Sequence, residues 1–263
     1  MQKKIEIIYE DQYLVVCRKM PGIPVQTAKM GQQDMVSLLR SYYAAKGKDT
    51  QIFVVHRLDQ PVEGIMVFAR TKQAAADLSS QSRQRSMDKC YLALVEGRLK
   101  PSSGVLEDDL LRDGKSNTSS VVPRGTPKAK QAKLLYTVQQ VWQMETGQVH
   151  KKNESGQEEK FWQPKWKIDF ICPDKIKDRA ISLLEVKLET GRHHQIRVQM
   201  AHAGYPLVGD KKYNPNCPPG YLPVGLCSVK IAFCHPVTKK FLEFTLEPQG
   251  ELFQYFSACA RVV

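Results

Sequence analysis

The chain has 263 residues, of which 42% are hydrophobic and 8% aromatic, and its 39 lysines and arginines against 27 acidic residues give a formal net charge of +12. This length and hydrophobic content exclude a disordered chain and a small disulfide-stabilised protein. No stretch approaches the ~18 apolar residues of a membrane-spanning helix, and residues 1–5 lack the apolar core of a signal peptide. We therefore expect a soluble, cytoplasmic protein with an anionic partner, which can be nucleic acid, an anionic membrane or an acidic substrate.

The predicted strands are runs in which apolar residues alternate with polar ones or follow one another without a break. In chain order they are 5–9, 13–18, 53–55, 65–69, 90–95, 131–142, 161–172, 181–188, 229–233 and 240–246. The first two are separated by three polar residues and predict a hairpin. We expect a single α+β domain over residues 1–263, because no linker interrupts these elements, with a mixed and mainly antiparallel sheet.

Three helices are predicted from apolar residues at helical spacing and from capping residues. Asp34 and Thr71 are typical N-caps, and Gly204 is typical of a C-terminal cap. The predicted helices run from Asp34 to about Gly47, from Thr71 to Arg83, and from His194 to Ala203.

The segment 112–133 carries almost all its charge with one sign, because Asp113 is its only acidic residue. Its basic residues are Arg112, Lys115, Arg124, Lys128, Lys130 and Lys133. The rest is mainly Ser, Thr, Pro and Gly, which predicts a mobile basic loop that closes over a polyanion, with a merely solvated loop as the alternative. Residues 145–160 are polar and contain glycine, and they predict a protruding hairpin tip.

Seven cysteines, an odd number without a C-x-x-C pair, favour free thiols in a reducing compartment. Cys217, Cys227, Cys234 and His235 come closest to a zinc-binding cluster, but the short paired spacings of zinc sites are missing. We therefore expect no metal.

Two polar segments, 56–64 and 189–197, combine charged side chains with Pro or Gly. Asp59 follows a predicted core strand, and Arg192 lies where a helix begins. If these two side chains faced each other, the guanidinium would keep the carboxylate ionised and fix its geometry. An ionised, oriented aspartate can act as a nucleophile.

The sequence around these residues resembles the RluA-type family of pseudouridine synthases. Val55-His56-Arg57-Leu58-Asp59 resembles the family's H-R-L-D signature. Further matches in the family's order are Ile7–Gly22 (its first motif), Lys89–Gly97 (K-x-Y-x-A-x-V-x-G), Thr190–Arg197 (T-G-R-x-H-Q-I-R), Gly204–Asp210 with Tyr213 (G-x-P-x-x-G-D-x-x-Y), and His235-Pro236 (a late H-P). The matches span most of the chain in order, which chance does not explain.

The resemblance implies isomerisation of a specific uridine to pseudouridine in ribosomal or transfer RNA. The glycosidic bond would break, the base would turn, and C5 of the uracil would be joined to the ribose. Substrate and product are isomers, so no cofactor is expected. The resemblance also implies the pseudouridine synthase fold, with a bent central sheet flanked by helices and loops, and RNA as the partner of a monomeric protein.

The resemblance also assigns roles to residues. Asp59 would be the catalytic carboxylate, attacking either the ribose or the base, and Arg192 would be its ion-pair partner. Tyr91 would lie against the target uracil and could move a proton, although aromatic packing is an equal interpretation. Arg57 would help displace the target nucleotide from its helix or loop.

Four further residues are RNA-binding candidates, and three of them have a structural alternative. His56 can instead form local hydrogen bonds, His193 can cap a helix, and Arg197 can form an ion pair. Lys211 can contact a backbone phosphate. Of the adjacent His193 and His194, we expect one ring to face inward and the other outward.

The chain departs from the family pattern in several places. After H-R-L-D the family usually has Thr-Ser-Gly, whereas this chain has Val62-Glu63-Gly64. Glu63 could perturb Asp59, contact a base edge, or pair with an arginine. The family's R-V-H is Arg197-Val198-Gln199 here, and its L-H-A is Leu226-Cys227-Ser228. The family's common N-terminal S4 RNA-binding module is not expected, because the first motif begins at Ile7.

Two other functions stay open from the sequence. The first is an RNA-binding or ribosome-assembly protein that keeps the fold without catalysis, and Glu63 favours it. The second is a hydrolase that uses Asp59 and Glu63 as paired carboxylates. Two carboxylates so close together on a loop with proline do not ensure the separation that such chemistry requires.

Overall fold

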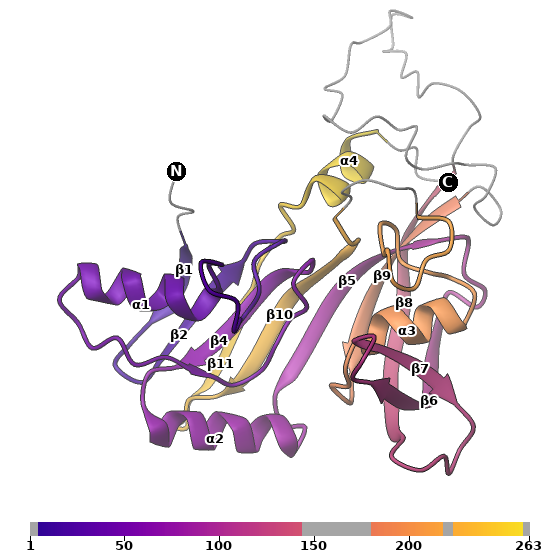
Figure 1. Cartoon of the computed structure of the whole chain (residues 1–263). Coiled ribbons are helices and arrows are strands. Elements are labelled where there is room, and N and C mark those ends of the chain that lie inside the picture. Colours follow the sequence, from indigo (N-terminus) through magenta and orange to yellow (C-terminus); the bar gives the residue numbers. More distant parts are fainter. Residues whose placement is uncertain (1–4, 144–179, 218–222, 260–263) are drawn as a thin grey trace, which may run out of the picture. The chain divides into compact units, whose positions relative to one another are not determined.

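The computed structural model describes residues 5–143, 180–217 and 223–259, which form two compact units (Figure 1). Unit 1 comprises residues 1–91 and 227–248, and unit 2 comprises residues 92–226 and 249–263. The chain leaves unit 1 within β5 (Asp88–Glu96) and returns to it within β10 (Leu226–Cys234). The prediction of one uninterrupted domain did not anticipate this division, because no linker marks it in the sequence.

The sheet of unit 1 is mixed. Its strand order is β1-β2-β4-β10, with β3 on β4, β11 on β10, and the start of β5 beside β10. The β4–β10 pair is parallel, and the β1–β2, β2–β4, β3–β4 and β10–β11 pairs are antiparallel. The bounds of the remaining strands are Glu6–Glu10 (β1), Leu14–Lys19 (β2), Phe53–Val54 (β3), Glu63–Ala69 (β4) and Phe241–Thr245 (β11).

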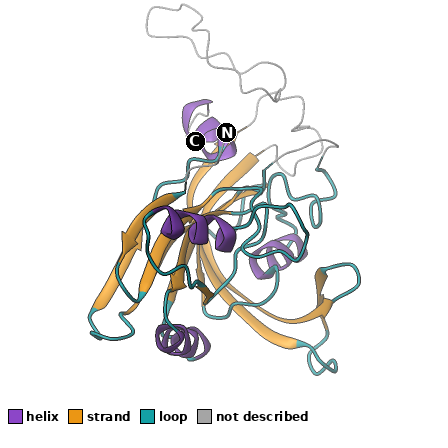
Figure 2. Ribbon diagram, turned by 60° about the vertical axis from the view of Figure 1, so that its left-hand side comes forward, coloured by secondary structure: helices purple, strands orange, loops and turns teal. Residues whose placement is uncertain are grey.

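The two helices of unit 1 begin at the predicted caps. Figure 2 shows the helices of the chain beside its strands. Helix α1 (Met35–Ala45) has a capping box, in which Asp34 accepts from the Ser37 amide and Ser37 Oγ accepts from the Asp34 amide. Helix α2 (Lys72–Arg83) begins where Thr71 Oγ1 accepts from the Ala74 amide. Side-chain acceptors thus satisfy amides that have no partner within the helix.

The core of unit 1 lies between α2 and the central strands. Every residue of β2 and β4 is buried, as expected of strands covered on both faces. One face packs against α2 through buried apolar residues: Leu14, Val16, Ile65, Val67, Ala69, Ala74, Leu78, Met87, Ile231 and Phe233. This packing supports the loop between β3 and β4, which carries Asp59.

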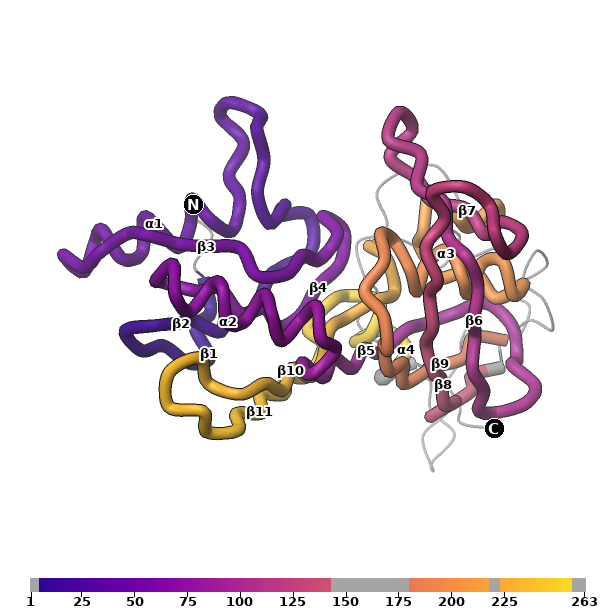
Figure 3. Tube along the Cα trace, turned by 90° about the horizontal axis from the view of Figure 1, so that it is seen from below, coloured from indigo at the N-terminus to yellow at the C-terminus, as the bar shows by residue number. Residues whose placement is uncertain are grey.

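Unit 2 has an antiparallel run of strands in the order β9-β8-β6-β7, with the end of β5 beside β9. The strand bounds are Ser103–Asp113 (β6), Thr118–Val122 (β7), Lys130–Gln143 (β8) and Ala180–Leu188 (β9). Helix α3 (Gln195–His202) lies beside β6 and β7 (Figure 3), where Val198 packs on Leu110 and Ala132. Helix α4 (Glu251–Cys259) contacts β8 through the rings of Phe256 and Trp142.

The predicted loop at 112–133 is wrong as secondary structure. The segment contains the end of β6, all of β7 and the start of β8, joined by turns. Its serines and threonines fit an edge strand, where alternate side chains face solvent. Arg124 pairs with Glu107 at 3.3 Å, and Lys133 pairs with Glu189 at 3.1 Å, so acidic residues outside the segment offset part of its charge.

The remaining predictions divide into three groups. The mixed, mainly antiparallel sheet with few helices is confirmed, as are the first hairpin and the three predicted helices. The predicted strand 161–172 and hairpin tip 145–160 lie outside the described residues. The irregular loop predicted to run through Gly64 is wrong at its end, because Glu63 and Gly64 pair with Cys227 and Ser228 as the first residues of β4. Among the described helices, none is long and apolar enough to cross a membrane.

Candidate active site

The loop that carries Asp59 is fixed by a buried lysine. Lys19, the last residue of β2, is fully buried, and its Nζ donates to the carbonyl oxygens of Met20 (3.2 Å), Gln60 (2.9 Å) and Val62 (2.7 Å). The Val62 amide also donates to the Asp59 carbonyl at 3.0 Å and closes a turn. The backbone just after Asp59 is therefore held from two directions.

Lys19 also contributes charge beside the catalytic candidate. Burial lowers its pKa to about 7, whereas the negative charges of Asp59 and Glu63 act to raise it. Three carbonyl acceptors match the three N–H donors of an ammonium group, so the geometry favours the charged form. A buried cation therefore lies close enough to Asp59 for their charges to interact.

Tyr91 shares the environment of Asp59 in unit 1. The side chain is 6% exposed and hydrogen-bonds to Ser228 on β10. Burial raises the pKa of the Tyr91 phenol above its ordinary value; the Ser228 bond opposes this rise, and the negative charge of Asp59 adds to it. The phenol therefore keeps its proton at neutral pH and does not serve as a preformed base.

Gly64 allows β4 and β10 to approach each other next to this site. Its φ of +142° is rarely adopted by other residues, and a Cβ added there would lie 2.5 Å from the backbone N and O of Ser228. The parallel register sets Ser228 opposite Gly64 and Cys227 opposite Glu63. Glycine is therefore required at this position for Ser228 to reach Tyr91.

Glu63, the departure from the family pattern, pairs with an arginine. Its Oε1 accepts from Arg18 Nη1 at 2.8 Å, and both side chains are buried, with exposures of 3% and 5%. Arg18 also donates from Nε to Glu6 (2.8 Å) and from Nη1 to the Glu247 carbonyl (3.0 Å). Of the three possible roles for Glu63, pairing with an arginine is therefore confirmed.

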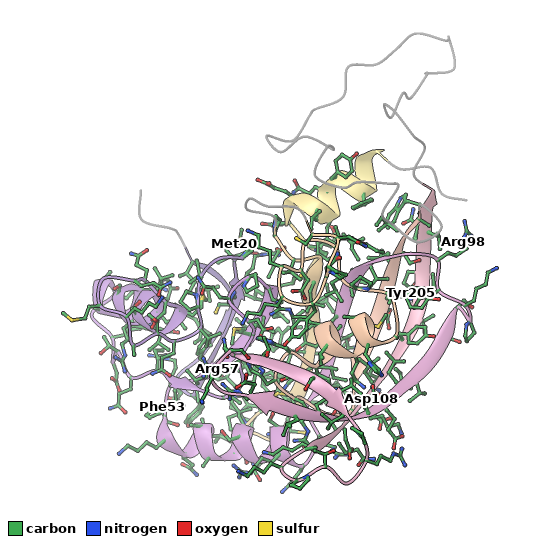
Figure 4. The ribbon with its side chains drawn as sticks, turned by 45° about the vertical axis from the view of Figure 1, so that its right-hand side comes forward. Met20, Phe53, Arg57, Arg98, Asp108 and Tyr205 are labelled. Carbon is green, nitrogen blue, oxygen red and sulfur yellow. The ribbon has the colours of Figure 1, made fainter. Side chains whose placement is uncertain are left out.

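His56 and Arg57 flank the signature aspartate in different ways. His56 Nε2 accepts from the Val67 amide at 3.2 Å, the local role named as its alternative. Burial, followed by the positive charge of Lys89, moves the pKa of His56 well below its ordinary value, so the ring is neutral. Arg57 is exposed on the same loop (Figure 4), where a nucleic acid could reach it.

In unit 2, the turn at residues 190–195 that carries Arg192, called the Arg192 turn, is fixed by neutral hydrogen bonds and by one bond from the Arg192 guanidinium. Gln195 Oε1 accepts from the Arg192 amide (2.9 Å) and from Thr190 Oγ1 (2.8 Å), and Thr190 Oγ1 accepts from the Lys133 amide (2.8 Å). Arg192 Nε donates to the Gln131 carbonyl at 2.8 Å. The turn is thereby attached to β8. The predicted pair of Arg192 with Asp59 joins residues of different units and stays a prediction.

The two histidines after Arg192 do not face opposite ways as predicted, because their rings stack with centroids 3.7 Å apart. His194 is buried with a left-handed φ of 54° and makes no side-chain capping bond. The half-buried His193 contacts Ser119 Oγ through Nδ1 (2.9 Å) and Asn117 Oδ1 through Nε2 (3.2 Å). Both ring nitrogens of His193 thus contact the β6–β7 hairpin, so helix capping is wrong for this side chain.

Arg197 is wrong as an RNA-binding candidate. Its side chain is buried and makes a bidentate pair with Asp210, with Nε to Oδ2 at 2.7 Å and Nη2 to Oδ1 at 2.6 Å. Its guanidinium also lies over the Tyr213 ring, 5.2 Å from the centroid. A buried arginine is stable when paired in this way, which confirms the ion-pair alternative. Lys211 is exposed, and its contact with RNA stays a prediction.

Sequence reasoning gave no site role to Lys19 or Ser228. Lys19 stood in the first family motif, and its position directly after the run Leu14–Arg18, which is apolar except for Arg18, was the one available signal. Ser228 carried no signal, because its role depends on strand register. Among the described residues, no three His, Cys, Asp or Glu side chains are grouped so that they could hold a metal ion.

Comparisons with known proteins identify the family to which this chain is similar. A family model described as RNA pseudouridylate synthase matches residues 13–202. Ribosomal large subunit pseudouridine synthase D of Pseudomonas aeruginosa is 32% identical over 213 residues, which cover 80% of this chain and 53% of that protein. tRNA pseudouridine synthase C of Vibrio cholerae is 27% identical over 207 residues, which cover 78% of this chain and 72% of that protein.

The fold is also similar to a solved structure. Human RNA Pseudouridylate Synthase Domain Containing 4 aligns with 98% of this chain and 94% of its own, with a TM-score of 0.68 and 21% identity. This likeness concerns the fold alone. The chain spans between 53% and 61% of the length of three curated relatives that it matches.

Proposed function

Because the chain belongs to the RluA-type family of RNA pseudouridine synthases, we propose that it isomerises a uridine of RNA to pseudouridine as a cytoplasmic monomer without a cofactor. The observation that carries the proposal is the environment of Asp59. A half-buried carboxylate on the loop between β3 and β4 is fixed through a buried lysine and interacts electrostatically with a buried tyrosine. Such preorganised charge is expected of a catalytic group.

Asp59 would supply the carboxylate that attacks the nucleotide, at either the ribose or the base. The N1–C1′ bond then breaks, the uracil turns, and C5 bonds to C1′, while the bond between the nucleotide and the Asp59 carboxylate breaks and releases the carboxylate. The C5 proton leaves and N1 gains a proton, so atoms balance without an external reagent. Lys19 would hold Asp59 in position by fixing the backbone that follows it.

Tyr91 would contact the target uracil through its ring. Its raised pKa supports this packing role over that of a preformed base, because the phenol stays protonated near neutral pH. Arg192 would pair with the Asp59 carboxylate. The target base must first leave its stack at a cost of a few kcal/mol. Arg57 would offset part of that cost, since its exposed guanidinium can bind phosphate or fill the vacated position.

Ribosomal RNA is the first candidate substrate, and transfer RNA is the second. The 32% identical Pseudomonas aeruginosa relative is named for the large ribosomal subunit, and the 27% identical Vibrio cholerae relative is named for tRNA. The net charge of +12 fits either polyanion.

The decisive experiment maps pseudouridines in all RNA of cells that lack the gene and of the same cells supplied with the wild type, Asp59→Asn or Lys72→Met. Lys72 is an exposed residue of α2, and its variant is the control. We expect the wild type and Lys72→Met to restore a site that Asp59→Asn leaves unmodified. If that site still carries pseudouridine in cells with Asp59→Asn, Asp59 is not the catalytic carboxylate.

An RNA-binding protein without catalysis would give one map in all four cell lines. The pairing of Glu63 weakens this alternative, because the carboxylate that favoured it is buried against Arg18. Loss of RNA binding as salt rises would accompany either function and does not separate them.

A further inference from the structure

The turn between β6 and β7, residues 114–117, is attached to the residue that follows Arg192. His193 Nε2 lies 3.2 Å from Asn117 Oδ1, and His193 Nδ1 lies 2.9 Å from Ser119 Oγ. An amide oxygen only accepts, so Nε2 carries a proton, and in a neutral ring Nδ1 accepts from the serine hydroxyl. A neutral imidazole therefore satisfies both hairpin side chains at once.

Two further contacts hold the same hairpin. The Ser119 amide donates to the Tyr213 hydroxyl at 2.8 Å, and that hydroxyl lies 2.7 Å from His194 Nδ1. Lys212 Nζ donates to the Asn117 carbonyl at 2.7 Å. The rings of His193 and His194 stack, with centroids 3.7 Å apart. The hairpin is thus attached to the start of α3 and to the loop that follows α3.

The Arg192 turn is itself attached to β8 through Gln195, Thr190 and the Gln131 carbonyl. His193 lies between these two sets of bonds, since its backbone continues the Arg192 turn and its ring binds the hairpin. His193 is therefore the direct side-chain link between the hairpin and the residue next to Arg192, alongside the contacts of Tyr213 and Lys212.

We propose that His193 is a positioning residue that couples the β6–β7 hairpin to Arg192, so that RNA bound on the hairpin fixes Arg192 for the reaction. The proposal rests on the proposed function. Position 193 is the variable position of the T-G-R-x-H-Q-I-R pattern, so this coupling is a property of this chain rather than of the motif.

The tip of the hairpin, residues 112–117, has the basic side chains that an RNA contact requires. Arg112 at the end of β6 and Lys115 in the turn are both exposed. Asp113, the one acidic residue of this tip, accepts from the Lys115 amide at 2.8 Å and from the Ser116 hydroxyl at 2.6 Å. The other acidic residues of β6, which are Glu107, Asp108 and Asp109, accept from Arg124, Gln199 and the Gly125 amide, respectively. The two basic side chains can therefore bind phosphates while the Asp113 carboxylate stays occupied locally.

Hydrogen exchange tests the coupling without any assumption about activity. We expect faster exchange of the β7 amides, residues 118–122, in His193→Ala than in the wild type, and wild-type exchange in His202→Ala. His202 is an exposed histidine at the other end of α3 and is the matched control. Unchanged β7 exchange in His193→Ala would overturn the coupling.

Single-turnover kinetics test whether the reaction depends on this coupling between the hairpin and Arg192. The probe is RNA containing 5-tritiated uridine from cells that lack the gene, because bonding of C5 to the ribose releases the tritium. We expect His193→Ala to lower the rate at saturating enzyme by roughly 10- to 100-fold, as a misplacement of about 1 Å would. The dissociation constant of the RNA should stay unchanged, and His202→Ala should react at the wild-type rate.

Two variants identify the contact responsible. His193→Gln keeps one donor and one acceptor and should recover most of the rate. Asn117→Gly removes the acceptor but permits the left-handed φ of 52° at that position, and it should lower the rate as His193→Ala does. Weaker RNA binding at an unchanged rate would overturn positioning and make His193 an RNA contact. A wild type that releases no tritium would refute the proposed function, whereas β7 exchange would still decide the coupling.

Discussion

The loop that carries Asp59 and the turn that carries Arg192 are both fixed to a neighbouring strand, but by different groups. A buried ammonium binds the backbone after Asp59, and a buried Arg18–Glu63 pair fixes the strand that follows. An amide and a hydroxyl, those of Gln195 and Thr190, fix the Arg192 turn.

This difference shows where each region is vulnerable. A buried charge that loses its partner costs several kcal/mol, whereas a neutral hydrogen bond costs about 1 kcal/mol net and more only if a buried group stays unsatisfied. We therefore expect substitutions in unit 1 to act mainly on stability. Substitutions at the Arg192 turn should act mainly on activity.

The largest expected effect comes from Lys19→Met. The variant leaves the carbonyls of Met20, Gln60 and Val62 without their donor, and we expect a loss of about 4 kcal/mol in the free energy of unfolding. Urea unfolding measures the loss, and Lys72→Met is the exposed control. A loss below about 1 kcal/mol would mean that the ammonium does not hold the loop.

Glu63→Ser, which introduces the family's usual residue, should cost about 3 kcal/mol because Arg18 loses its buried carboxylate. Urea unfolding of the double variant Arg18→Met/Glu63→Met provides the control, since it removes both charges together. The double variant should be the more stable of the two. If Glu63→Ser were the more stable variant, the loss of stability would come from removing the ion pair itself and not from leaving the Arg18 charge without its buried partner.

Gln195→Met should cost about 2 kcal/mol, because the Arg192 amide, the Thr190 hydroxyl and the Lys133 carbonyl each lose a neutral partner. The rate of tritium release should also fall at temperatures where the variant is fully folded, where the loss of stability alone would leave the rate unchanged. Gln139→Met on the exposed face of β8 is the control. Equal rates for both variants would contradict a positioning role for the Arg192 turn.

The smallest expected effect is a pH dependence. Folding lowers the pKa of His56, so below its unfolded value of about 6.5 the unfolded chain binds more protons than the native one. Stability should therefore fall as pH falls below that value, by at most about 1.4 kcal/mol per pH unit. Urea unfolding between pH 5 and 7.5 should show a shallower slope for His56→Gln. Parallel slopes would indicate that His56 titrates alike in both states.

The sequence predicted α1, α2 and α3 because local chemistry determines their ends, but it did not predict α4. Asp34 and Thr71 cap α1 and α2 as predicted, since each side chain satisfies amides only a few residues away. The β6–β7 hairpin was missed for the opposite reason. Its residues are polar on an edge strand, so the apolar alternation that identifies a strand is weak there.

Site residues were harder to predict where charge is buried. Arg197 has the same sequence signal as an exposed phosphate-binding arginine, and only the fold brings Asp210 to it. Lys19 closes a strand in which every residue is buried, and nothing local indicates the three carbonyls that surround it. Composition therefore predicted an anionic partner, but it could not separate charges that serve the fold from charges available to RNA.

Gly64 constrains how this protein can be redesigned. A side chain at that position would occupy space held by the backbone of Ser228, and backbone cannot rotate away as a side chain can. No single substitution on β10 restores the space, because the obstruction includes the backbone N and O that every residue has. Changes intended to widen or reshape the surroundings of Tyr91 must therefore leave position 64 as it is.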